Sequence, residues 1–232
     1  MENADTYSIQ YEFNFDDGSI KTFLIELDVE TISIVRPQPT DFPDWTLLET
    51  EQCECCPLSV NDVQYCPIAV NIAELVEEFK NYFSYDNCLV RCVTQERTYE
   101  KKTSVQEGLF SIMGIIMPTS NCPVMSFLKP MARFHLPFST SEETLFRSAA
   151  IYLLQQYFEH KRGGQPDFEM QHLPSRLQMV QDVNAGIIAR IRSVSEKDAD
   201  ANAVIILDSF SRILEMALEE RLSSLEYLFP QG

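Results

Sequence analysis

Glycine is scarce in this sequence, with seven residues among 232. Loops that cradle phosphate or a dinucleotide need glycines at fixed spacing, and the chain contains neither pattern. It also lacks a serine nucleophile elbow and a paired-histidine metal helix, so the usual hydrolase, kinase and dehydrogenase motifs are missing. No run of about 18 uncharged apolar residues occurs, and the first residues do not resemble a secretory signal. We therefore expect a cytoplasmic protein with no membrane partner.

Basic residues are also few: the sequence has 18 Lys and Arg and 35 Asp and Glu, so the formal net charge is −17. Residues 1–100 hold 20 of the acidic and 5 of the basic side chains, a net charge of −15, whereas the net charge of residues 101–232 is −2. This negative charge repels phosphate backbones and anionic lipid, so we expect no nucleic-acid binding. A protein partner with a basic surface is the better match for the acidic part.

The chain has ample material for a core, because 45% of its residues are hydrophobic and 11% are aromatic. Apolar and polar residues alternate from Tyr7 to Phe15, which predicts a strand buried on one face. A turn with Gly18 and a second alternating run over Phe23–Leu27 predict a β-hairpin. Thr31–Val35 and Leu89–Val93 are predicted to add further strands.

Helical spacing dominates the remainder of the sequence. Apolar residues recur at helical spacing from Ala69 to Phe83, and Thr140 to Glu143 fit a capping box at the start of a later helix. The other predicted helices are Val105–Met117, Cys122–Phe134, Ser141–His160, Ser175–Val194 and Asn202–Leu228. We predict an α+β fold, with a small antiparallel or mixed sheet and a crossover helix at the N-terminus, followed by a C-terminal helical bundle.

This pattern divides the chain into two units. Residues 1–100 form an acidic α+β unit with a cysteine cluster, and residues 101–232 form a mostly helical unit packed on it. The last predicted helix carries an apolar stripe from Ala203 to Leu218. Such a stripe faces the core of a monomer or forms the seam of a homodimer.

Cysteine is the most informative residue type, with seven present. An odd number in a reducing compartment favours thiols, metal ligands or redox groups over a disulfide framework. Cys53 and Cys56 have the CxxC spacing that lets two thiolates meet at one tetrahedral ion, and zinc matches a sulfur-rich ligand set. Cys66 and Cys122 would complete the site, with His135 and Cys55 as alternative ligands. Free thiols and a redox group remain competing interpretations.

Two further cysteines suggest a structural role. Cys88 and Cys92 lie four residues apart on a predicted strand, so both point to one face. Small buried hydrophobes are the interpretation that this spacing favours.

Cys122 also has features of a nucleophile. Thr119 to Pro123 have the order of a helix start, where a thiol would feel the positive end of the helix dipole. His135 would then serve as its base and Arg133 would hold an anion. The competing interpretation is a capped structural helix followed by a packed turn.

The sequence contains several short motifs: Trp45-Thr46, CxxCPL over Cys53–Leu58, Cys66-Pro67, Glu96–Tyr99, Thr119–Pro123 and Pro130–Phe138. Together they resemble those of one family of uncharacterised bacterial proteins, a domain of unknown function. The resemblance covers nearly the whole chain, and it implies a bacterial cytoplasmic protein without an established activity. It also singles out Cys53, Cys56, Cys66 and Cys122 as thiols that belong together.

The leading hypothesis is a non-catalytic interaction or regulatory protein with a cysteine site that binds zinc. The alternative is a thiol-based enzyme or redox sensor that uses Cys122 with Arg133 and His135. Neither follows from fold class alone, because function resides in the site.

Overall fold

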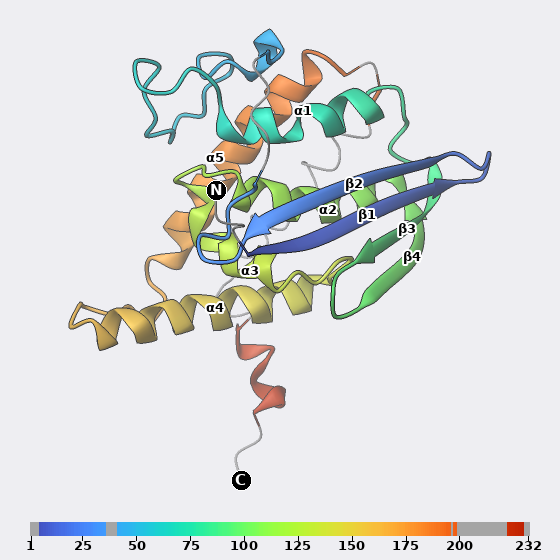
Figure 1. Cartoon of the computed structure of the whole chain (residues 1–232). Helices are drawn as coiled ribbons and strands as arrows, with labels where there is room; N and C mark the ends of the chain where they lie inside the picture. Colours follow the sequence, from blue (N-terminus) through green and yellow to red (C-terminus); the bar gives the residue numbers. More distant parts are fainter. Residues whose placement is uncertain (1–4, 36–40, 196, 199–221, 230–232) are drawn as a thin grey trace.

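The fold was analysed in a computed structural model that describes residues 5–35, 41–195, 197–198 and 222–229. A four-stranded antiparallel sheet has the order β2-β1-β3-β4 (Figure 1). Its strands are β1 (Thr6–Phe15), β2 (Ile20–Asp28), β3 (Asn87–Val93) and β4 (Thr98–Ser104). The helices are α1 (Pro67–Phe79), α2 (Val105–Thr119), α3 (Lys129–Arg133), α4 (Ser141–Lys161) and α5 (Leu173–Arg192), with short 3-10 turns η1 (Asp44–Thr46), η2 (Met125–Leu128) and η3 (Glu226–Leu228).

The α+β class is therefore confirmed, and the sheet is antiparallel. The finer prediction, an N-terminal crossover helix followed by a C-terminal helical bundle, is not confirmed. Instead, α1 follows the hairpin of β1 and β2, and α2 packs directly on the sheet. Most of the last predicted helix, with its apolar stripe, lies outside the described residues.

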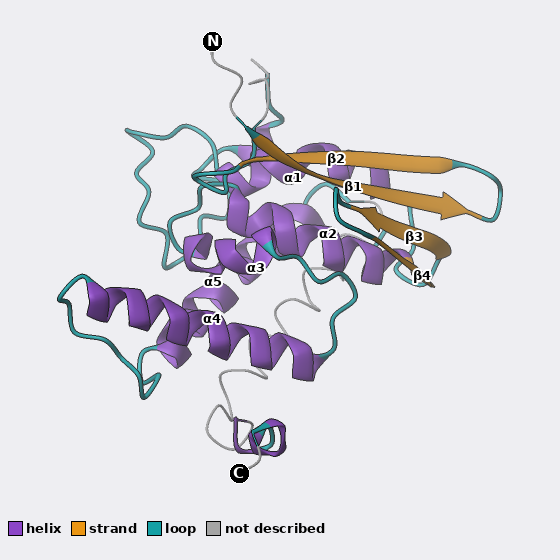
Figure 2. Ribbon diagram, turned by 60° about the horizontal axis from the view of Figure 1, so that its bottom comes forward, coloured by secondary structure: helices purple, strands orange, loops and turns teal. Residues whose placement is uncertain are grey.

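One face of the sheet forms the core, and α1 and α2 cover it (Figures 1 and 2). The alternating apolar residues of β1 from Tyr7 to Phe13 are buried, as the sequence predicts, and Phe15 is half-buried. Phe79 at the end of α1 lies with its ring 4.9 Å from that of Phe13 and 5.7 Å from that of Phe23. Cys88 and Cys92 are buried on the same face of β3, which confirms their interpretation as small core residues. The same hydrophobic cluster includes residues of α5, so both predicted units contribute to it.

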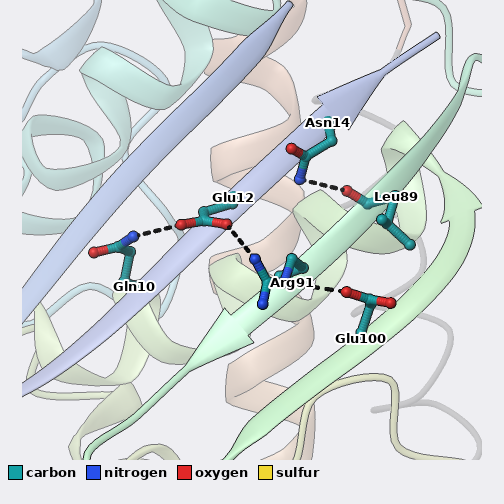
Figure 3. Close-up of polar contacts among 6 residues, drawn as sticks. All are labelled: Gln10, Glu12, Asn14, Leu89, Arg91 and Glu100. Atoms are coloured by element: carbon teal, nitrogen blue, oxygen red, sulfur yellow. Dashed lines mark hydrogen bonds and ion pairs between the residues drawn. The ribbon is translucent and has the colours of Figure 1, made fainter. Parts of the chain in front are cut away.

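Charged side chains occupy the opposite face of the sheet (Figure 3). Arg91 on β3 lies between two carboxylates, 3.3 Å from Glu12 on β1 and 3.1 Å from Glu100 on β4. Gln10 donates to the other carboxylate oxygen of Glu12 at 2.7 Å. The two ion pairs of Arg91 join residues directly opposite each other on neighbouring strands, where opposite charges support the register of the sheet.

Two strand predictions need correction. Thr31–Val35 is not a strand, because the Asp28 carboxylate accepts from the backbone N–H of Thr31 at 2.7 Å and closes a turn. A single bridge between Leu27 and Ile34 is all the pairing that this segment makes with β2. β4 was missed, since its charged residues and largely exposed pattern are typical of an edge strand rather than of a core strand.

The helix predicted over Cys122–Phe134 is also wrong in its continuity. The chain forms η2 and then the short α3. Pro130 stands in the first turn of α3, where a missing N–H is tolerated, and it cannot donate to a preceding helical turn. By contrast, the capping box at Thr140 and Glu143 is confirmed at the start of α4.

Candidate functional site

Four cysteines from distant parts of the sequence line one small cavity. Cys53, Cys56, Cys66 and Cys122 surround a space of about 20 Å³, here called the cysteine cavity. The remaining walls are apolar and come from the loop before α1, from α1 itself, from the segment after α2 and from α5. They consist of Leu48, Leu58, Pro67, Ile68, Val124, Val183 and Ile187.

Cys55 lies outside this cavity. Its Sγ instead lies 3.4 Å from the backbone carbonyl oxygen of Met179 on α5. Burial raises the pKa of the Cys55 thiol, and the nearby Asp182 carboxylate adds to the rise.

The loop of residues 47–66, here called the cysteine loop, is closed at its base by backbone hydrogen bonds. Leu48 N–H donates to the carbonyl of Gln64 at 2.9 Å, and Cys66 N–H donates to that of Thr46 at 2.8 Å. Cys66 is the residue before the first turn of α1, and Pro67 fills the first helical position. This closure brings Cys66 back to the CxxC turn, in which Cys56 N–H donates to the Cys53 carbonyl at 3.0 Å.

Helix α5 holds the base of the cysteine loop through one buried arginine. The guanidinium of Arg190 donates to three backbone carbonyls, those of Trp45 at 2.9 Å, Leu47 at 2.6 Å and Leu48 at 2.9 Å. Arg190 is 1% exposed. The planar guanidinium of arginine has several N–H donors in a fixed arrangement, so it can bind several carbonyl oxygens at once more readily than the ammonium group of a lysine can.

A glycine on the same helix allows the cysteine loop to approach closely. A Cβ at Gly186 would lie 2.8 Å from Cys53 Sγ and 3.2 Å from the carbonyl oxygen of Glu51. Any other side chain at this position would push the loop away from α5. Gly186 therefore sets the distance between α5 and the first cysteine of the cluster.

Cys122 lies in the tight connection between α2 and η2. Asn121 before it has a φ of 62°, a left-handed conformation that asparagine tolerates better than most residues. The hydroxyl of Ser33 donates to the Asn121 side chain at 2.6 Å, and Lys129 Nζ donates to Ser33 Oγ at 2.7 Å. These contacts tie the turn after β2 to the segment that carries Cys122.

Two thiols of the cluster, Cys53 and Cys122, have raised pKa values. Burial raises the pKa of Cys53 to about 12, and the neighbouring cysteines, Cys66 first among them, add to the rise. Burial also raises the pKa of Cys122, although the backbone N–H groups of Met125 and Val124 hydrogen-bond to its sulfur and oppose the rise. A raised pKa is the opposite of what a nucleophilic thiol needs at neutral pH.

The structure does not bring Cys122 together with the other two predicted catalytic residues. His135 lines a second, larger pocket, and its Nε2 lies 2.6 Å from the Tyr11 hydroxyl. Burial lowers the pKa of His135 to about 3, with the Arg147 charge as a lesser cause. The Arg133 guanidinium lies over the Tyr7 ring, 3.9 Å from its centre.

Within the described part of the chain, no group of three or more His, Cys, Asp or Glu side chains has the arrangement of a formed metal site. A tetrahedral zinc site requires sulfurs about 2.3 Å from the ion. The four cysteines share a cavity, so binding would require them to close in on a common centre. The donor set, four sulfurs in an apolar pocket, is one that zinc accepts.

Residues 9–230 match the family described as "Domain of unknown function (DUF6901)". The chain belongs to this family. No curated protein and no solved structure matches it. Among the described residues, no helix has both the length and the apolar character needed to cross a bilayer.

Sequence reasoning missed the residues of α5 that shape the site. Gly186 and Arg190 lie on a helix that was predicted, but they were not singled out within it. A signal was available, because Arg190 stands beside Ile187 and Ile191 on the apolar side of the helix. A charged residue on a buried face needs dedicated partners, and here the partners are three backbone carbonyls at the base of the cysteine loop.

Proposed function

We propose that the protein is a non-catalytic interaction or regulatory protein whose cysteine loop is fixed by a zinc ion bound to Cys53, Cys56, Cys66 and Cys122. The observation that carries the proposal is that these four side chains line one small apolar cavity. They come from the cysteine loop, the start of α1 and the segment after α2. A zinc ion there would join these three parts of the chain.

Zinc is favoured over a set of four free thiols on energetic grounds. A structural zinc site contributes directly to folding free energy, because the unfolded chain has no preformed site. Binding at neutral pH releases the protons that burial holds on Cys53 and Cys122. The backbone N–H groups of Val124 and Met125, which point at Cys122 Sγ, are donors of the kind that stabilise a metal-bound thiolate.

A non-catalytic role is favoured because the residues of the alternative are apart. Cys122 lines the cysteine cavity, whereas His135 lines the larger pocket and forms a hydrogen bond with the Tyr11 hydroxyl. Reduced thiols or thiolates at all four positions suit a reducing compartment such as the cytoplasm. The strongly acidic first hundred residues would face a basic protein partner.

Metal analysis of the untagged full-length protein tests the proposal. We expect about one zinc per chain, bound at substoichiometric levels by the Cys56→Ser and Cys122→Ser variants. Cys55→Ser is the matched control, because it removes a neighbouring thiol outside the cavity and leaves the zinc content unchanged. A chain that is folded, fully reduced and free of zinc would overturn the proposal.

Thiol labelling distinguishes the zinc site from the thiol enzyme. With zinc bound, Cys53, Cys56, Cys66 and Cys122 are protected from alkylation until a chelator is added, and Cys55 reacts first. Selective rapid labelling of Cys122 at neutral pH, in the presence or absence of chelator, would instead establish the catalytic alternative.

A further inference from the structure

A second pocket, distinct from the cysteine cavity, lies among the helices. It measures about 130 Å³ and lies among α2, η2, α3, α4 and α5, the group of helices below the sheet in Figure 2. Its walls are mainly apolar. Four methionines contribute to them: Met113, Met117, Met125 and Met131.

One polar residue in this apolar pocket has no hydrogen-bond partner. Asn184 on α5 lines the pocket and is 1% exposed. Both its Nδ2 and its Oδ1 lack a partner within the described part of the protein. A buried amide in this state destabilises the fold, and native proteins rarely leave both of its atoms unpaired.

Other polar groups of the pocket are already engaged by the protein. The Arg147 guanidinium donates to the carbonyls of Phe134 at 2.7 Å and Met131 at 2.9 Å. The Ser111 hydroxyl accepts from Phe138 N–H at 2.9 Å. Asn184 therefore differs from these neighbours in offering a free donor and a free acceptor.

A glycine in the wall of the pocket leaves part of the pocket unfilled. Gly114 lies in the interior of α2, where glycine is a poor helix former. A Cβ at this position would meet no heavy atom within 4 Å. Gly108 on the same helix is different, because a Cβ there would lie 2.4 Å from the Phe13 ring. Close packing against Phe13 requires glycine at position 108. At position 114 no neighbour requires glycine, and the absence of a side chain leaves open space in the pocket.

We propose that this pocket binds a small molecule with a single aromatic ring and a neutral amide group. The size follows from the volume, since a dry cavity of about 150 Å³ accommodates benzene. Methionine sulfurs make favourable contacts with aromatic rings, which suits a ring among the four methionines. The amide pairs with Asn184: its carbonyl accepts from Nδ2 and its N–H donates to Oδ1. A carboxylate can only accept, so it would leave Oδ1 facing another acceptor.

Binding of benzamide to the full-length protein, followed by calorimetry and by ligand-observed NMR, tests this site. We expect saturable binding at one site per chain, with benzoate at least tenfold weaker. The Asn184→Leu variant should bind benzamide about 10- to 100-fold more weakly, because two hydrogen bonds are lost, yet bind toluene at least as well as the wild type. Its unfolding midpoint should equal or exceed that of the wild type, since no unpaired amide remains.

A second variant keeps the test decisive if Asn184→Leu does not fold. Gly114→Leu places a side chain into the open space and should abolish binding of both benzamide and toluene, while Gly114→Ala retains binding. The proposal is overturned if benzamide does not bind, if benzoate binds more tightly, or if Asn184→Leu and Gly114→Leu bind benzamide as the wild type does. Each of these measurements reads out benzamide or toluene binding or the stability of the chain, and none requires zinc at the cysteine site, so the two proposals can fail separately.

Discussion

Replacing Gly186 by alanine tests how closely the cysteine loop packs on α5. Alanine in place of an interior helical glycine stabilises a helix by about 1 kcal/mol when nothing obstructs the new methyl group. At Gly186 the methyl carbon would lie 2.8 Å from Cys53 Sγ and 3.2 Å from a backbone carbonyl oxygen. Overpacking of this kind costs about 1–3 kcal/mol. The gain and the cost oppose each other, so we expect Gly186→Ala to lie between no change and a loss of about 2 kcal/mol.

Gly114→Ala is the matched control, since it makes the same chemical change inside α2 with no heavy atom within 4 Å of the new carbon. It should stabilise the protein by up to about 1 kcal/mol. The quantity of interest is the difference between the two variants in free energy of unfolding, about 1–3 kcal/mol, measured by urea denaturation. Gly186→Ala should also weaken zinc binding, because Cys53 is displaced. Equal stabilisation by the two substitutions would show that the loop does not rest on α5 as described.

Two further perturbations probe neighbouring contacts. Arg190→Met removes the donors to the carbonyls of Trp45, Leu47 and Leu48 at the base of the cysteine loop. It should lower the free energy of unfolding by about 2–4 kcal/mol in urea denaturation, with Arg190→Lys recovering part of the loss. A loss below about 0.5 kcal/mol for Arg190→Met would contradict this role. Burial lowers the pKa of His135 from 6.5 to about 3, so, as the pH falls, this histidine is protonated in the unfolded chain before it is protonated in the folded one. The contribution of neutral His135 to the free energy of unfolding is therefore present above pH 6.5 and is lost as the pH falls toward 3. The difference in free energy of unfolding between the wild type and His135→Gln should change by about 2–4 kcal/mol across this range. A pH-independent difference would exclude the buried neutral imidazole.

Local patterns in the sequence predict the elements whose stability is local. The alternation of Tyr7 to Phe15 identifies β1, because a strand that is buried on one face must alternate. The capping box at Thr140 identifies the start of α4 for a similar reason, since its hydrogen bonds span three residues. In both cases the stabilising contacts lie within the pattern itself.

Elements that depend on distant partners escape the same reasoning. β4 pairs with β3 through its backbone, and its charged side chains give no apolar signal. The CxxC spacing indicates that Cys53 and Cys56 are neighbours, but the position of Cys122 depends on the turn after β2 and on the end of α2. The local periodicity of apolar residues does not predict which residues from distant parts of the sequence come together. The four cysteines were grouped from their spacing and from the family resemblance, and the fold places all four around one cavity.

Helix α5 forms a wall of both cavities, and this explains why its buried face contains residues that a simple core helix would avoid. Val183 and Ile187 face the cysteine cavity, whereas Val180 and Asn184 face the larger pocket. On the opposite side, the consecutive residues Val124 and Met125 divide in the same way. The two cavities thus share α5 and the segment of Val124 and Met125 as walls. Because packed interiors respond to changes of a single methylene, filling either cavity should shift the wall that it shares with the other. Any such coupling must be reciprocal: if benzamide changes zinc affinity by some factor, zinc changes benzamide affinity by the same factor.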